Sequence, residues 1–222
     1  MNDSSIYRAV QLSAMVFLVF SIIGCADRLS STFYLLSPAS VVKDEAIFRV
    51  QGDCIHLRIA RVTIPEYLNR THIATRTTEN NLTLSDDDQW AEPLSDTVAR
   101  VLAENISQHL CTKKISLSPG RMSGESDYRV EVEIYQMDGS LGKDAVLDVW
   151  WTVTRGTGNI LLRSKRSTFS ESVSGNTYSD FVQAQSRILD TFSREIAETI
   201  QKGRFIPAAG PQERGDHIQG LL

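Results

Sequence analysis

Alternating hydrophobic and polar residues predict several β-strands along the chain. Residues 55–62 place Ile55, Leu57 and Ile59 on one side of the backbone, and residues 128–136 repeat the pattern. A period of two residues is typical of a strand with one buried face. Runs of β-branched, aromatic and aliphatic residues predict further strands at residues 31–36, 73–77, 82–84, 144–155 and 160–170.

Turn-forming residues join these strands into two antiparallel units. Residues 79–81 (Glu-Asn-Asn) follow the strand at 73–77 and predict a hairpin, because asparagine tolerates positive φ angles. Residues 138–139 and 156–159 separate the last three strands and predict a meander. Since residues 160–170 are the most polar, we expect them to form an edge strand protected by its charges.

A first amphipathic helix is predicted after the hairpin. Apolar residues recur three and four positions apart from Leu94 to Leu110. The acidic run Asp86–Asp88 and Pro93 suit the first turn of a helix, which has unpaired N–H groups and a positive dipole end. We expect this helix to end near Cys111.

A second amphipathic helix is predicted at residues 179–202, with Gly203 as its C-cap. Proline, glycine and charged residues dominate residues 204–222, which predicts a flexible tail. The order of elements predicts one α+β domain over residues 25–203. In it, two amphipathic helices pack on one face of a mainly antiparallel sheet.

The N-terminal segment differs from the rest of the chain. Ala14–Ile23 is a run of about ten residues without a charge. A membrane-spanning helix needs about 20 apolar residues. The run therefore has the length of a signal-peptide core.

The residues that end this run resemble a bacterial lipobox, Ile22-Ile23-Gly24-Cys25. A small residue precedes the scissile bond, and the cysteine thiol accepts the diacylglycerol. We therefore expect residues 1–24 to be a lipoprotein signal peptide and Cys25 to be the acylated first residue; the alternative is a short buried helix with a chance cysteine. Ala26 follows in place of the aspartate typical of inner-membrane retention, which favours the periplasmic face of the outer membrane. Asp27 leaves inner-membrane anchoring open.

The remaining cysteines are an even pair, Cys54 and Cys111. In an oxidising compartment they can form a disulfide, which would close a long loop and contribute about 4 kcal/mol by chain entropy. Two separate buried thiols are the alternative.

Composition and motifs argue against several classes of protein. The chain has 222 residues and a net charge of −4, enough for one domain and without the basic excess of a nucleic-acid binder. Its histidines have no metal-ligand spacing; they are His56, His72, His109 and His217. No nucleophile elbow or phosphate-binding loop is present, and Asp86–Asp88 suit a helix start better than a metal site. We expect no catalytic, cofactor or metal residues and no enzymatic activity.

One long segment carries a family resemblance. Residues 64–110 closely resemble the hallmark segment of the ABC-type transport auxiliary lipoproteins, the PqiC/YmbA-like family. The matching residues are Ile64, Pro65, Tyr67, Leu68, Arg70, Ile73, Arg76, Asn81, Trp90, Ala91, Glu92, Pro93, Leu94, Leu102 and Asn105. Thr71 departs from the family's common proline, and Ile106 from its usual leucine. The lipobox, the Phe-Tyr-Leu-Leu strand and the C-terminal helix extend the resemblance over nearly the whole mature chain.

The resemblance implies a role in lipid transport between membranes. It implies as partners a periplasmic MCE-domain (PqiB-like) protein and an inner-membrane permease, with this chain docking the periplasmic conduit to the outer membrane. It also implies a homo-oligomeric ring at the end of the conduit. The alternative function is a lipid carrier or chaperone with its own acyl-chain cavity.

Five residues are candidates for partner binding. Trp90 and Pro93 lie at the junction of hairpin and helix, although Trp90 also suits a core position there. Arg76 is either an interface residue or a structural partner of Glu92 or the nearby aspartates. In a regular strand, Trp150 points away from Trp151, which predicts an exposed aromatic contact.

Overall fold

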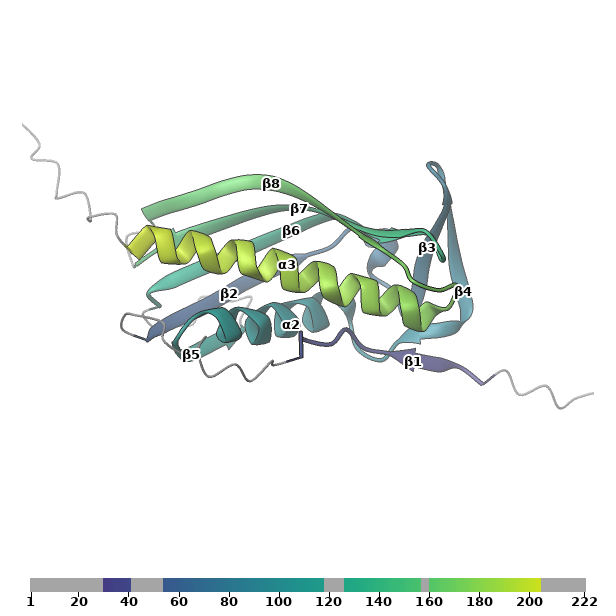
Figure 1. Cartoon of the computed structure of the whole chain (residues 1–222), viewed down its shortest axis with the longest axis horizontal. Helices are drawn as coiled ribbons and strands as arrows, with labels where there is room; N and C mark the ends of the chain where they lie inside the picture. The colour runs from purple at the N-terminus through teal and green to yellow at the C-terminus, as the bar shows by residue number, and fades with distance from the viewer. Residues whose placement is uncertain (1–29, 41–53, 118–125, 157–159, 205–222) are drawn as a thin grey trace, which may run out of the picture. The chain divides into compact units, whose positions relative to one another are not determined.

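The fold is built from eight strands, two α-helices and one short 3-10 helix within the described residues (Figure 1). The computed structural model describes residues 30–40, 54–117, 126–156 and 160–204. In chain order, its elements are β1 (Thr32–Tyr34), β2 (Ile55–Thr63), η1 (Glu66–Leu68), β3 (His72–Thr78), β4 (Asn81–Trp90), α2 (Leu94–His109), β5 (Thr112–Leu117), β6 (Tyr128–Gly139), β7 (Asp144–Arg155), β8 (Ile160–Ser172) and α3 (Tyr178–Arg204). The predicted α+β class is confirmed.

The larger sheet has five strands in the order β5-β2-β6-β7-β8. Its last three strands are the predicted antiparallel meander, with the polar β8 at an edge. β2 runs parallel to both β5 and β6. Alternate residues of β6 and β7 are fully buried, as their period of two predicts; they include Val130, Leu147, Val149, Trp151 and Val153.

A second sheet has three strands in the order β1-β4-β3. β3 and β4 form the predicted hairpin, and β1 pairs with β4 in parallel. The expectation of one sheet is therefore wrong. The hairpin and the meander each have their own pairing partners, so the strands divide into two mixed sheets.

Both α-helices cover the same face of the five-stranded sheet (Figure 1). α2 packs on β2 and β5, whereas α3 packs on β7 and β8 and also contacts α2. Phe192 of α3 is fully buried, and its ring meets the Trp151 ring edge-on at 6.0 Å between centroids. Within the described residues, neither helix has an apolar stretch long enough to cross a membrane.

The acidic run Asp86–Asp88 does not start a helix, contrary to our expectation. It lies in β4, and α2 begins only at Leu94, after Pro93. Asp88 is held in the strand by two hydroxyl groups: Ser85 Oγ donates to its carboxylate at 2.7 Å and Tyr34 Oη donates at 2.7 Å. β4 pairs with β3 at Leu84 and Gln89, on either side of the acidic run, and with β1 at Asp88, and this pairing outweighs the local helix-start signal.

Two further local features differ from the sequence-based expectation, one strand and one glycine. β5 was not predicted, because its lysine-rich sequence lacks a clear apolar alternation. Gly203 is not a C-cap; it is buried inside the last turn of α3, which extends to Arg204. A Cβ atom at Gly203 would lie 2.6 Å from Leu162 Cδ1, so the close approach of α3 to β8 accounts for this glycine.

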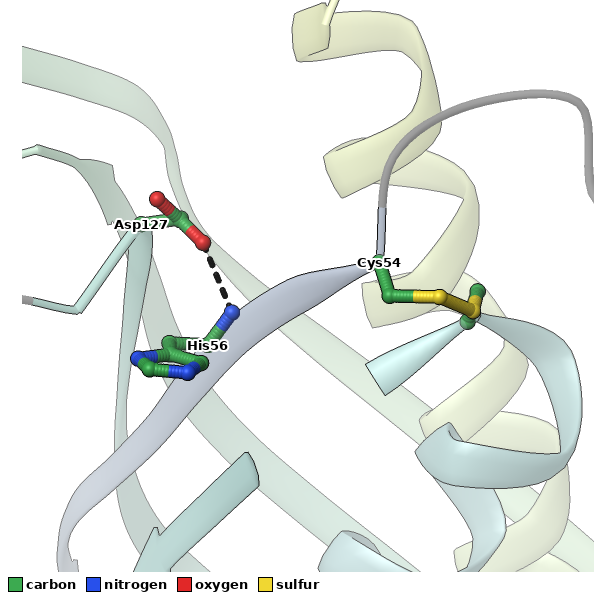
Figure 2. Close-up of a disulfide and its surroundings, with 4 residues drawn as sticks. Cys54, His56 and Asp127 are labelled. Atoms are coloured by element: carbon green, nitrogen blue, oxygen red, sulfur yellow. Dashed lines mark hydrogen bonds between the residues drawn. A yellow bond between two sulfur atoms is a disulfide. The ribbon is translucent and has the colours of Figure 1, made fainter. Parts of the chain in front are cut away.

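A disulfide joins Cys54 and Cys111, with their Cα atoms 4.6 Å apart (Figure 2). It ties the start of β2 to the end of α2, next to the hydrogen bond from Ile55 N to Cys111 O at 3.0 Å. On the other side of β2, His56 N donates to Asp127 Oδ2 at 2.7 Å (Figure 2). The beginning of β2 is thus fixed from both sides.

Removal of this disulfide should destabilise the fold. The bridge closes a loop between residues 57 positions apart. We expect Cys54→Ser to lower the free energy of unfolding by about 4 kcal/mol, because the unfolded chain gains loop entropy. Urea denaturation measures the change. The double variant Cys54→Ser/Cys111→Ser is the control, and reductant should not change its free energy of unfolding. An unchanged midpoint of the parent protein under reductant would contradict the expectation.

Candidate functional site

The face of the five-stranded sheet opposite the helices is largely open. Strand register aligns its side chains in two rows, Thr63–Glu133–Trp150–Arg166 and Arg61–Glu131–Thr152–Ser164. We call this surface, together with Tyr135, the outer face. A depression of about 360 Å³ lies on it, lined mainly by β2, β6 and β7 around Trp150. The outer face presents an aromatic ring surrounded by charged and hydroxyl groups.

Trp150 and Trp151 lie on opposite faces of β7. Trp151 is fully buried, whereas 41% of Trp150 is exposed. Trp150 Nε1 donates to Ser164 Oγ at 3.0 Å, and Ser164 Oγ also lies 2.9 Å from Thr152 Oγ1. These bonds hold the indole in one orientation while its ring stays accessible. An aromatic side chain fixed in this way loses little entropy when a partner covers it.

Arg166 and Tyr135 form a second feature of the outer face. The Arg166 guanidinium lies 4.8 Å from the centroid of the Tyr135 ring, which is itself 43% exposed. Arg166 Nε donates to Asp148 Oδ1 at 2.8 Å, and this hydrogen bond lowers the pKa of Asp148. Our sequence reasoning missed both residues. Tyr135 continues the alternation of Glu131 and Glu133, so the signal for it was present.

Arg76 belongs to a buried cluster and not to the outer face. Its Nε and Nη2 donate to the carboxylate of Asp138 at 3.0 and 2.7 Å. Tyr67 Oη and Gln136 Nε2 donate to the same carboxylate at 2.8 and 2.7 Å. Of the two roles that the sequence left open for Arg76, a structural one is observed, but its partner is Asp138 and not Glu92 or the nearby aspartates. The cluster connects β3 and η1 to β6, and so joins the two sheets.

The electrostatics of this cluster favour a charged Asp138. Burial raises the pKa of Asp138, but the hydrogen bonds from Arg76, Tyr67 and Gln136 outweigh burial and bring it below its usual value. Burial, followed by the hydrogen bond to Asp138, raises the pKa of Tyr67. The carboxylate therefore stays ionised and the phenol stays a donor at neutral pH.

The other sequence candidates lie at the junction of β4 and α2. Trp90 is 6% exposed and belongs to the core, which agrees with the core alternative for this residue. Glu92 and Pro93 are exposed, and Glu92 Oε2 lies 3.6 Å from Arg100 Nη2. They lie on different elements from Trp150. Cys25 lies outside the described residues, so its acylation stays a prediction.

Across residues 30–40, 54–117, 126–156 and 160–204, no three His, Cys, Asp or Glu side chains are grouped so that they could hold a metal ion. The arrangement of the outer face suits contact with a macromolecule, because aromatic and arginine side chains lie together on an open sheet.

Most of the two sheets and both helices match a known family. The model of the ABC-type transport auxiliary lipoprotein component matches residues 34–197. The chain belongs to this family. The predicted resemblance to PqiC and YmbA is confirmed, since the family includes them. The chain is thus an auxiliary lipoprotein of an ABC-type transport system, anchored to a membrane. Membership implies a non-catalytic role.

Two solved structures share this fold. A crystal structure of an uncharacterized protein aligns at a TM-score of 0.62 and 16% identity, covering 77% of this chain and 99% of its own. A protein from Xanthomonas campestris aligns at a TM-score of 0.63 and 15% identity, covering 78% of this chain and 99% of its own. PelC from Paraburkholderia phytofirmans, solved as a dodecamer, aligns more weakly, at a TM-score of 0.38 and 10% identity, covering 67% of this chain and 87% of its own. No curated protein matched the chain.

Loss of Arg76 should destabilise the fold far more than loss of a surface arginine. We expect Arg76→Ala to cost about 3 kcal/mol, because it leaves the buried Asp138 carboxylate without its countercharge. Arg100→Ala is the matched control; Arg100 pairs with Glu92 and Glu104 at 3.6 and 3.5 Å on the surface. Its loss should cost less than about 1 kcal/mol. Chemical denaturation of both variants measures the difference, and equal costs would contradict a structural role for Arg76.

The same cluster should make stability depend on acid. The folded-state pKa of Asp138 lies below its ordinary value of 3.8. The stabilisation of the fold by the ionised Asp138 carboxylate is therefore fully present above pH 3.8, and it is lost as the pH falls through the lower pKa of the folded state. In Asp138→Asn, this part of the acid dependence should disappear from the pH profile of unfolding.

Proposed function

We propose that this chain docks the periplasmic conduit of an MCE-type lipid transporter to the outer membrane. Family membership supports a role as an auxiliary transport component. The lipobox at Cys25 supports a membrane anchor, and Ala26 after it supports the outer membrane. The observation that carries the proposal is the fixed, exposed Trp150 on an open sheet face, which supplies a surface for a protein partner.

The outer face has the chemistry of a protein-binding surface. Tryptophan, tyrosine and arginine dominate the binding energy of most interfaces, and all three occur here as Trp150, Tyr135 and Arg166. Charges of both signs surround Trp150, with Arg61 on β2 and Glu133 on β6. Such charges orient a partner and exclude wrong ones more than they add affinity. We infer that an MCE-domain protein covers Trp150.

Membership in the PqiC/YmbA family also supports a homo-oligomeric ring at the end of the conduit, with the permease at the inner membrane. A ring would repeat the outer face around one axis. Several weak contacts to a symmetric conduit then add up to firm attachment, because each further contact forms within the same assembly. In such a ring, a small contact surface on each copy is sufficient for firm attachment of the whole assembly.

Replacement of Trp150 should separate docking from folding. We expect Trp150→Ala to reduce co-purification of the MCE-domain protein at least about tenfold, because a central aromatic contact is lost. The measurement is a pull-down of the acylated chain after mild detergent extraction. Leu82→Ala is the matched control, since Leu82 is 39% exposed on β4 and Trp150 is 41% exposed. Equal recovery from the two variants would rule out the outer face as the docking surface.

Acylation of Cys25 should account for the membrane attachment. Metabolic labelling with palmitate should mark the parent chain and leave Cys25→Ser unlabelled, because serine has no thiol to accept the diacylglycerol. Density-gradient fractionation should place the labelled chain with the outer membrane. Equal labelling of the parent and Cys25→Ser would remove the anchor from the proposed function.

A further inference from the structure

Two large apolar side chains are exposed in the described part of the chain, one in β1 and one directly after it. Phe33 is 61% exposed and Leu35 is 43% exposed, and the two alternate with residues that turn inward. Leu36 is 1% exposed, and Tyr34 Oη donates to Asp88 at 2.7 Å. Burial and this hydrogen bond raise the pKa of Tyr34 to about 12, so the phenol remains a donor.

The backbone that carries Phe33 and Leu35 is firmly attached to the domain. Phe33 pairs with Gln89 in the three-stranded sheet, and Ala91 N donates to Tyr34 O at 2.9 Å. Just after β1, Ala39 N donates to Asn105 Oδ1 of α2 at 2.9 Å. The two apolar side chains are therefore displayed by β1 and the residue after it, on backbone that is fixed at both ends.

The length of chain before β1 limits where Phe33 can lie. Cys25, the acylation site of the proposed function, precedes Phe33 by eight residues. Because an extended chain spans at most about 3.5 Å per residue, Phe33 stays within about 28 Å of the acylated residue. This distance is no greater than the thickness of the hydrocarbon core, which is about 30 Å.

We propose that Phe33 and Leu35 form a second contact with the bilayer that carries the lipid anchor. The occupant of this surface is the interfacial region of the membrane, where apolar side chains enter the boundary between headgroups and acyl chains. The contact is shallow, because polar residues lie next to Phe33 across the sheet: Gln89 is its register partner on β4, and His72 on β3 pairs with Gln89. The acidic Asp87 lies two residues before Gln89.

A second contact has a mechanical consequence. Acyl chains fix the location of the domain, but acylation at a single residue does not by itself fix its rotation. Contact through β1 removes that freedom and gives the outer face a constant orientation relative to the membrane. The inference rests on the acylation of Cys25 in the proposed function and is independent of the docking partner.

Photo-cross-linking tests the inference on the acylated full-length protein. Phe33→benzoylphenylalanine keeps an aromatic side chain at the site and adds a group that reacts with any neighbouring C–H bond. Leu161→benzoylphenylalanine on β8 is the matched control, because Leu161 is also 61% exposed. Each protein is reconstituted in vesicles of phosphatidylethanolamine and phosphatidylglycerol and irradiated. Intact-mass spectrometry then measures the mass of the protein and of its adducts.

We expect phospholipid adducts at position 33 in several-fold higher yield than at position 161. Equal yields at the two positions would overturn the membrane contact. Covalent dimers at position 33 without phospholipid adducts would also overturn it and identify a second copy as the occupant. The mass before irradiation reports acylation itself, and the Trp150→Ala pull-down reports docking, so each failure is distinguishable from the others.

Discussion

The buried carboxylate of Asp138 is the constraint on which the arrangement of the two sheets depends. It lies near the end of β6, a strand whose Glu131, Glu133 and Tyr135 are exposed, yet it is fully buried. A charge in this position is tolerable only with several donors. Arg76 of β3, Tyr67 of η1 and Gln136 of β6 supply them. The small sheet therefore packs against one end of β6 and leaves the outer face around Trp150 accessible.

As a result, the two faces of the five-stranded sheet have different roles. One face packs under α2 and α3, where Trp151 meets Phe192 and stability is concentrated. The other face holds Trp150 by a hydrogen bond to Ser164 and keeps its ring in contact with solvent. Because adjacent residues of a strand point in opposite directions, one dipeptide serves both the core and the candidate binding surface.

Local periodicity predicted the meander, the hairpin and both helices well, because each depends on neighbours within one segment. It failed where partners outside the segment decide. Asp86–Asp88 look like a helix start, but β4 pairs with β3 before and after them, and Asp88 pairs with Thr32 of β1. β5 has little apolar alternation and exists through its pairing with β2. At the candidate site, the exposure of Trp150 followed from alternation, whereas the partner of Arg76 lies 62 positions away and had no local signal.

The sequence by itself determined the family, the α+β class and the opposite orientation of the two adjacent tryptophans, since motifs and periodicity are properties of short segments. The lipobox likewise led to the prediction of an anchor without any knowledge of the fold. Only the tertiary structure decided that there are two sheets, that Asp138 joins them and that Phe33 and Leu35 stay uncovered. These features depend on which distant residues meet, and the free energy of such contacts is set by burial and hydrogen bonding that no local pattern records.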